Sequence, residues 1–272
     1  MNSLRITSLQ RCCSIGFRQF SSLRNTFGCR SFLHSSKFFH STTVRGNDKE
    51  ELPEYMANTY HWAYVNPRNV ALLDNNFVVN TILFGNYIRI QNFALSEIKQ
   101  GDQVFMPASV YGSACRNIAK AVGEAGRLDI IDISPIQVVR NTRKLSRYPQ
   151  VTVLRGDARS FDLQAAYDVA CSFMLLHEIP DENKSSVVNN VLNSVKVGGK
   201  AVFIDYGRPS TLHPVRPILS FVNDWLEPWA KTLWAHPISS FAAPESQDHF
   251  VWETERTIFG GVYQKVVAHR IA

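Results

Sequence analysis

Beyond Gly101, short apolar runs and helical segments alternate regularly along the chain. The runs are nearly continuous in apolar residues, which is typical of strands that are covered on both faces. Strands that alternate with helices build a parallel sheet. The expected strands are Val104–Met106, Leu128–Asp132, Val151–Leu154, Tyr167–Phe173 and Ala201–Ile204. The expected helices between them are Ala114–Gly123, Ile136–Leu145 and Asp181–Ser194.

The residues before this alternation predict a helical N-terminal part. Glu54–Lys99 is expected to form two or three helices, because apolar residues recur there at helical spacing. The residues that define this spacing are Val70, Leu73, Phe77, Thr81, Phe84 and Ile88.

The residues after it complete the predicted fold. Val197–Lys200 is expected to be a turn, and Pro214–Leu233 a helical insertion rich in Trp, Leu and Phe. Thr254–Phe259 and Val262–His269, joined by two glycines, predict a β-hairpin. We therefore expect an α/β, Rossmann-like fold of the class I S-adenosylmethionine methyltransferase type. It has a mostly parallel sheet with a C-terminal β-hairpin, N-terminal helices and a helical insertion.

The basic charge of the chain is confined to its first 47 residues. This segment holds seven basic residues and no Asp or Glu, although the whole chain carries only +6. Arg-rich, Ser-rich and acid-free composition is typical of mitochondrial transit peptides. We expect residues 1–47 to be a disordered targeting peptide and residues 48–272 to be one domain; a basic tail that binds RNA or lipid is the alternative. The near-neutral remainder gives no support to nucleic-acid binding, and no apolar run is long enough to span a membrane.

Ligands of open α/β sheets bind beyond the carboxyl ends of the strands, where three loops are expected. The loop Ala108–Gly112 leads into a helix whose N-terminal amides can face an anionic group. Asp132 and Ile133 end the second strand, where a carboxylate can accept hydrogen bonds from ribose hydroxyls. Asp157 and Ala158 follow the third strand and are placed to read an adenine amino group. A helix N-cap for Asp132 and an ordinary turn for Asp157 remain open.

The first loop departs from the methyltransferase pattern. Such enzymes have a glycine-rich loop preceded by an acidic residue that holds the amino group of the cofactor. Here Met106 stands at the acidic position, and Ala108 and Val110 stand at two glycine positions. We hypothesise that the missing carboxylate leaves this amine uncharged and nucleophilic, because a nearby carboxylate raises the pKa of an ammonium group.

Several motifs resemble the RquA family of rhodoquinone biosynthesis, from about Glu54 to the C-terminus. The Val110-Tyr111-Gly112 replacement of the glycine loop is the most specific of them. The other motifs are Trp62–Arg68, Gly85-Asn86, Leu175–Pro180, Asp205–Pro209 and Leu212–Pro214. Gly207 and Ile179 depart from the family pattern.

The resemblance implies that ubiquinone is converted to rhodoquinone by exchange of a ring methoxy group for an amine. It also implies S-adenosylmethionine as the amino donor and Mn(II) as a supporting metal. The cofactor candidates are then Val110, Tyr111 and Gly112 together with the residues at the second and third strand ends. The substrate-binding candidates within the motifs are Trp62, Tyr64, Asn86 and Arg208.

Candidate catalytic residues fall at the ends of the fourth and fifth strands: His177, Glu178, Asp205 and Tyr206. His177 and Glu178 are adjacent, so they would point to opposite sides of a regular strand, whereas a loop would bring both inward. Their open roles are metal ligand, carbonyl polariser and general base. A helix-capping role for Glu178 is the alternative. Asp205 and Tyr206 are expected to line the quinone pocket.

A long-tailed quinone substrate requires access to a bilayer. Apolar residues of Val215–Leu233 share one helical face, and we expect this face to contact the matrix side of the inner membrane; a core-facing helix is the alternative. The members of this face are Ile218, Leu219, Val222, Trp225, Leu226, Trp229 and Leu233. The aromatic segment Tyr60–Tyr64 either stacks on the quinone or packs in the core.

Two rival functions remain open. One is a conventional quinone methyltransferase, and the other is a non-catalytic scaffold that binds quinone or a biosynthetic complex. A nicotinamide dehydrogenase does not fit, because no Gly-x-Gly-x-x-Gly follows the first strand.

Overall fold

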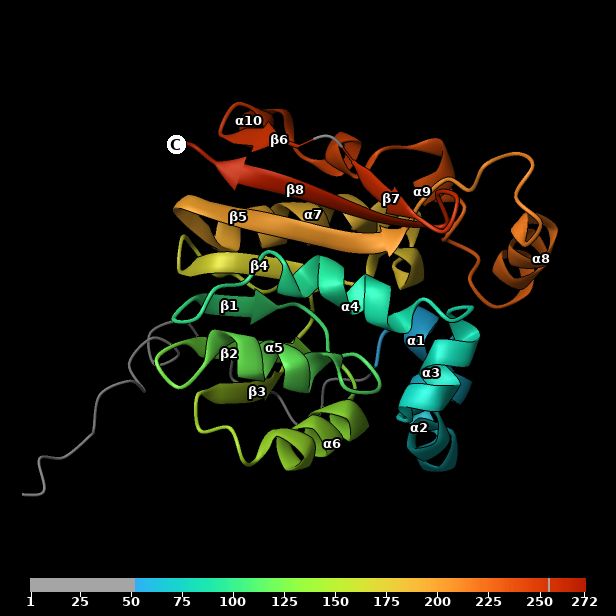
Figure 1. The fold of residues 1–272 in the computed structure, drawn as a ribbon, viewed down its shortest axis with the longest axis horizontal. Coiled ribbons are helices and arrows are strands. Elements are labelled where there is room, and N and C mark those ends of the chain that lie inside the picture. The colour runs from blue at the N-terminus through green and yellow to red at the C-terminus, as the bar shows by residue number, and fades with distance from the viewer. Residues whose placement is uncertain (1–51, 254) are drawn as a thin grey trace, which may run out of the picture. The chain divides into compact units, whose positions relative to one another are not determined.

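The apolar runs form the strands of one mixed sheet in a computed structural model, which describes residues 52–253 and 255–272. The strand order is β3-β2-β1-β4-β5-β8-β6, with β7 also paired to β8 (Figure 1). The pairs among β1 to β5 are parallel, and β8 runs antiparallel to β5. The strands are β1 Gln103–Met106, β2 Arg127–Asp132, β3 Val151–Arg155, β4 Tyr167–Phe173, β5 Val195–Tyr206, β6 Phe250–Trp252, β7 Arg256–Ile258 and β8 Tyr263–Arg270. The predicted targeting peptide lies outside the described residues.

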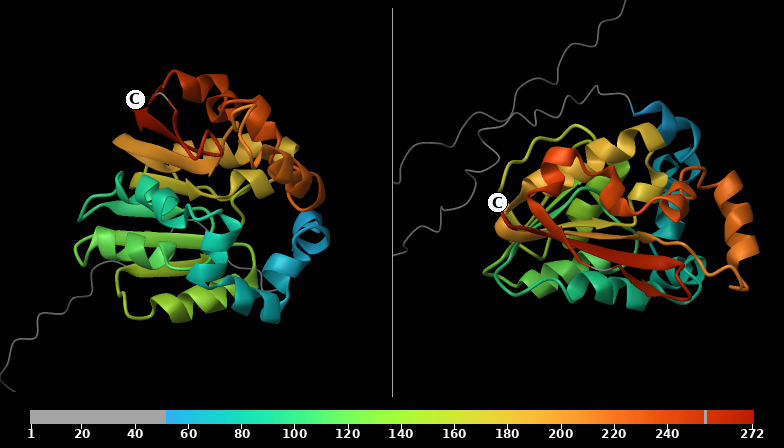
Figure 2. Two further views of the ribbon diagram at one scale, coloured as in Figure 1. Left: turned by 45° about the vertical axis from the view of Figure 1, so that its right-hand side comes forward. Right: turned by 90° about the horizontal axis from the view of Figure 1, so that it is seen from above.

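Both faces of the sheet are covered, because successive strand residues point to opposite sides. Val104 and Met106 belong to one core cluster with α4 and α5, whereas Phe105 belongs to a second cluster with α7. Figure 2 shows the sheet between these helical layers. The helices are α4 Tyr87–Leu95, α5 Ala114–Val122, α6 Pro135–Leu145 and α7 Asp181–Ser194. The class I methyltransferase-type α/β fold expected from the sequence is confirmed.

The N-terminal part is more broken than expected. It consists of α1 Glu54–Asn58, the π-helix η1 His61–Val65, α2 Pro67–Leu73, α3 Asn76–Ile82 and α4. Asn66 and Asn75 each cap a new helix with their side chains, which stops one helix from running into the next. The apolar residues that recur at helical spacing therefore do not share one buried face: Val70 is buried, but Phe77 is 79% exposed.

Two differences concern the end of the sheet. The turn expected at Val197–Lys200 is a bulge inside β5, with Gly198 at φ +80° and a register shift opposite Tyr167/Val169. The C-terminal hairpin is confirmed, since Arg256 pairs with Lys265 and Ile258 with Tyr263. β6, which pairs with β8 from Phe250 to Trp252, was not expected.

The helical insertion is interrupted. It contains α8 Arg216–Trp225, α9 Thr232–Ala235, the 3-10 helix η3 Ile238–Phe241 and α10 Pro244–Gln247. Its expected single apolar face divides in two, because the chain leaves the helix after Trp225. Leu219 and Leu233 are buried, whereas Ile218, Trp225 and Leu226 are exposed. Within the described residues, every helix is too short or too polar to cross a bilayer.

Candidate active site

A cavity lies at the carboxyl ends of the parallel strands, where the strand order reverses between β1 and β4. Loops after β1 to β4 line it together with the N-terminal helices and the segment after α8. The predicted site residues that line it are Trp62, Tyr64, Val110, Tyr111, Asp132, Ile133, Asp157, Ala158, His177, Glu178 and Tyr206. Four predicted site residues do not line it: Asn86, Gly112, Asp205 and Arg208.

Asp132 marks the end of the cavity expected to hold adenosine. Its carboxylate accepts hydrogen bonds from the Ser109 amide at 3.1 Å, the Ser109 hydroxyl and the Ser134 amide at 2.9 Å. Burial raises the pKa of Asp132 to about 6, although these hydrogen bonds lower it. A carboxylate has about four acceptor positions, so a ribose hydroxyl can still bind, and the Ser109 hydroxyl can rotate to make room.

Asp157 lies at the same end but has a partner of its own. The Arg159 guanidinium donates to both of its oxygens, with an Nη2–Oδ2 distance of 2.6 Å. The same guanidinium lies 5.3 Å from the centre of the Tyr55 ring. The Asp157 side chain is therefore held in a fixed orientation by Arg159 where it lines the cavity.

The amides at the start of α5 do not face an anionic ligand, contrary to the sequence expectation. The Gly112 amide donates to Asp74 Oδ1 at 2.8 Å, and the Ser113 and Ala114 amides donate to the Tyr87 hydroxyl. The N-terminal helices thus fold over this helix end and satisfy it. A side chain at Gly112 would collide with the Tyr87 hydroxyl, and the residue has φ +75°.

The rest of the first loop faces the cavity through Val110 and Tyr111. The Tyr111 ring stacks on Tyr64 at 5.5 Å, and its hydroxyl donates to the Ala63 carbonyl oxygen. Met106 is fully buried in the core and contributes no surface to the cavity. An aromatic residue of the N-terminal part therefore packs directly on the first loop of the cavity.

A histidine–carboxylate pair lies at the opposite end of the cavity. His177 Nδ1 is 2.8 Å from Asp205 Oδ1, and Asp205 Oδ2 accepts the Leu175 and Leu176 amides at 3.0 and 2.7 Å. These contacts fix the position of the Asp205 carboxyl group beside the imidazole. Burial lowers the pKa of His177, but Asp205 and the nearby glutamates raise it overall to about 9. His177 is therefore a cation at neutral pH.

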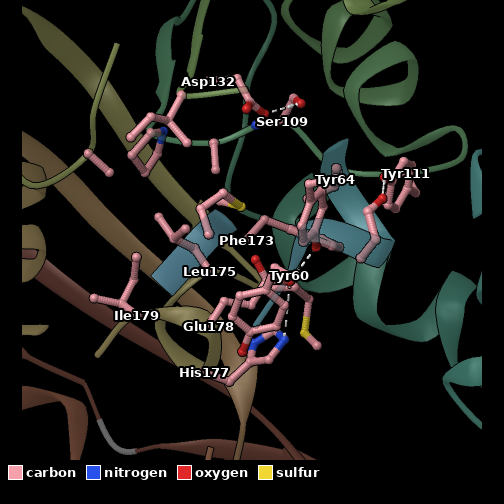
Figure 3. A pocket seen from close by; sticks show the side chains of 18 of the residues that line it. Tyr60, Tyr64, Ser109, Tyr111, Asp132, Phe173, Leu175, His177, Glu178 and Ile179 are labelled. Carbon is pink, nitrogen blue, oxygen red and sulfur yellow. Dashed lines mark hydrogen bonds and ion pairs between the residues drawn. The ribbon is translucent and has the colours of Figure 1, made fainter. Parts of the chain in front are cut away.

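Glu178 faces the cavity beside His177, because both lie on the 3-10 turn η2 Leu176–Glu178 (Figure 3). The loop geometry expected from the sequence is confirmed. Glu178 Oε1 accepts a hydrogen bond from the Tyr64 hydroxyl and lies 3.8 Å from His177 Nε2. Burial raises the pKa of Glu178 to about 8, with a further increase from Glu227.

Glu227 is a site residue that sequence reasoning missed. It lines the cavity from the segment after α8, and its Oε2 accepts the Tyr60 hydroxyl at 2.6 Å. Burial raises its pKa above the usual range. The signal in the sequence is a single charge within an otherwise apolar stretch, Trp225–Ala230.

The surroundings of His177 and Glu178 were compared with the ligand set that a metal ion requires. Within the described residues, no group of three or more His, Cys, Asp or Glu is placed to hold a metal ion. The expected Mn(II) and its ligands His177 and Glu178 therefore gain no support.

The two other substrate candidates lie away from the cavity. Asn86 is buried and donates to the carbonyl oxygens of Leu83 and Phe84, while it accepts from Arg89. Arg208 is exposed, beyond the end of β5. Asn86 thus stabilises the turn before α4.

Comparison with known proteins agrees with the fold. Residues 108–199, about a third of the chain, match a family model described as a methyltransferase domain. No curated protein sequence matches the chain significantly. The chain is similar to phosphoethanolamine N-methyltransferase 2 from Haemonchus contortus in complex with S-adenosyl-L-methionine, with TM-score 0.60, 12% identity and coverage of 82% of this chain and 60% of that one.

It is also similar to the N-methyltransferase NodS from Bradyrhizobium japonicum WM9 in complex with S-adenosyl-L-homocysteine. That match has TM-score 0.53, 13% identity and coverage of 80% of this chain and 99% of that one. These identities are low, so the likeness concerns the fold. The chain therefore has the class I methyltransferase-type fold, and its residues 108–199 match a methyltransferase domain.

Proposed function

We propose that this protein is an S-adenosylmethionine-dependent transferase that replaces a ring methoxy group of ubiquinone with an amino group, giving rhodoquinone. The observation that carries the proposal is the division of one cavity into two ends. One end presents Asp132 and Asp157, and the other presents His177, Glu178 and Glu227 among aromatic rings. A cavity of this kind suits a nucleoside cofactor and a flat, apolar acceptor that needs protons.

The cofactor end fits S-adenosylmethionine by the chemistry of its donors. Asp132 would accept the ribose hydroxyls, Asp157 the adenine amino group, and Ile133 and Ala158 would cover the base. When bound, S-adenosylmethionine supplies the amino group in this proposal. The absence of an acidic residue at Met106 is consistent with an amine kept uncharged.

The acceptor end fits a quinone ring. Tyr60, Tyr64 and Tyr206 provide apolar faces on which the ring packs. The imidazolium of His177 can donate from Nε2 to a quinone carbonyl oxygen, because Nδ1 is held by Asp205. This donation stabilises the negative charge that develops on the oxygen when a nucleophile adds to the ring.

The second candidate is a conventional quinone methyltransferase, which the methyltransferase-domain match at residues 108–199 favours. Glu178, with its pKa raised to about 8, would then accept the proton of a ring hydroxyl. A non-catalytic scaffold is the third candidate.

One experiment separates these functions. The chain is expressed in a ubiquinone-producing host that lacks rhodoquinone, and the extracted quinones are identified by mass spectrometry. The purified protein is then given cofactor labelled either at the amino nitrogen or at the methyl carbon. We expect rhodoquinone carrying the nitrogen label; a product carrying the methyl label favours the methyltransferase, and failure to bind the cofactor favours the scaffold.

We further propose that the protein works at the matrix side of the inner membrane, where its lipid substrate is located. Helix α8 supports this, because it exposes Ile218, Phe221 and Trp225 at helical spacing. This helix leads directly into Glu227, which lines the cavity. A bilayer that holds the quinone tail is the occupant we assign to this face.

A further inference from the structure

Glu227 is brought into the cavity by contacts between two distant parts of the chain. It accepts a hydrogen bond from Tyr60, which lies 167 positions earlier in the sequence and is 1% exposed. Next to it, the Trp229 ring packs 6.0 Å from Tyr60 and 5.9 Å from Tyr55. The carboxyl group is thus fixed in direction rather than free to turn to solvent.

The groups around Glu227 come from each element packed against it. His177 and Glu178 face it from η2, Asp205 from the end of β5, and Tyr60 from the N-terminal part. His177 favours the ionised form of Glu227, whereas Asp205 and burial favour the protonated form. Burial is the largest of these effects, so the pKa of Glu227 is raised above the usual range of a carboxyl group.

We propose that Glu227 is a catalytic residue that donates its proton to the oxygen leaving the bound quinone, and that Tyr60 aims it. The inference rests on the proposed function, because it names the group that completes the methoxy exchange. His177 and Glu178 were expected at this site from the sequence, and neither the motifs nor the fold assigned a role to Glu227.

The proton balance of the exchange needs one such donor. A carbon–nitrogen bond forms at the methoxy-bearing ring carbon, and an electron pair moves onto the conjugated carbonyl oxygen beside His177. The carbonyl re-forms as the carbon–oxygen bond breaks, and the departing oxygen takes the Glu227 proton, so that methanol leaves. The Glu227 carboxylate then accepts the proton released by the new nitrogen substituent. No oxidant or reductant enters this exchange, and its product is the ring joined through nitrogen to the α-carbon of the cofactor. Rhodoquinone forms when that nitrogen–carbon bond breaks, in a separate step in which Glu227 is given no role.

The test compares Glu227→Gln with the wild-type protein, both as full chains. Glutamine keeps the shape and the acceptor for Tyr60 but has no proton to donate. We expect kcat for quinone amination to fall by about 100-fold or more, with KM for quinone and the affinity for S-adenosylmethionine little changed. The pH profile should lose one ionisation, and Glu227→Asp should restore part of the rate. Asp224→Asn, an exposed carboxylate on α8, is the matched control.

The proton is also measured directly, by infrared difference spectroscopy of the wild type and Glu227→Gln during a pH titration. We expect a protonated-carboxyl signal that persists to higher pH than that of an ordinary glutamate and is lost in the variant. Equal signals, or equal rates and pH profiles, would overturn the role of Glu227. A wild type that forms no aminated quinone would refute the proposed function instead.

Discussion

Asp132 combines burial with an acceptor role that requires a negative charge. Its pKa is raised to about 6 because burial disfavours the carboxylate. A protonated carboxyl group loses acceptor positions, so it cannot receive the ribose hydroxyls as well as the ionised form does. In the proposed function, the charge state of this one buried side chain therefore decides how well its end of the cavity can accept hydrogen bonds from the cofactor.

We predict that the affinity for S-adenosylmethionine falls as the pH drops below about 6. The ionised form is the binding form, so each pH unit below this value should raise Kd by up to about tenfold. Isothermal titration between pH 5 and 7.5 measures the effect. Asp132→Asn should bind weakly at every pH and show no such slope. A wild-type Kd that stays constant over this range would contradict the assignment.

At this scale, sequence position predicts some residues of the cavity and misses others. Asp132 and Asp157 were predicted because the carboxyl ends of parallel strands share one edge of the sheet. Glu227 was missed because its contact with Tyr60 depends on two segments packing together across the whole domain. Asn86 was expected in the site, but its amide is used inside a turn.

At the scale of elements, the C-terminus of α2 is joined to the start of α5 through Asp74. This carboxylate accepts from the Gly112 amide, from Arg140 Nη2 at 2.8 Å and from Lys144 Nζ at 2.6 Å. Both cations come from α6. One side chain thus holds three elements together directly beneath the first loop of the cavity.

Removing this charge should loosen the first loop. Because the Asp74 side chain is only 8% exposed, we expect Asp74→Asn to lower the free energy of unfolding by about 1–3 kcal/mol. Urea denaturation measures the loss, and S-adenosylmethionine affinity should weaken with it. Asp224→Asn removes an exposed pair with Lys231 and should cost less than about 1 kcal/mol. Equal effects of the two substitutions would show that Asp74 has no special role.

Element boundaries were predictable where the chain itself encodes them. β4 and α7 have the predicted bounds, because each is a long run with one clear period. The break between α2 and α3 was not predicted, since the apolar spacing from Val70 to Ile88 continues across Asn75, whose side chain caps a new helix. The bulge at Gly198 was taken for a turn, because a positive-φ glycine serves both.

At the scale of the whole molecule, exposed apolar side chains surround the end where the cavity lies. Ile218, Phe221 and Trp225 are 53%, 65% and 74% exposed on α8. Ile82 is exposed on α3 and also lines the cavity. Figure 1 shows α3 and α8 beyond the carboxyl ends of the parallel strands. Exposed apolar side chains of this kind can mark a membrane-contact surface, and we call Ile82, Ile218, Phe221 and Trp225 the apolar rim.

We therefore predict that the purified protein binds phosphatidylcholine vesicles through this rim. Replacing Ile218, Phe221 and Trp225 together by Ser should weaken vesicle binding by about tenfold or more, because three side chains lose their burial in the lipid. Co-sedimentation measures the binding, and circular dichroism checks the fold. Val197→Ser is the matched control, since Val197 is 61% exposed at the opposite end of β5. If the triple variant binds as well as the control while its fold is intact, the quinone must enter without docking of α8. The bilayer contact would then have to be assigned to another face, with α3 and Ile82 as the next to be tested.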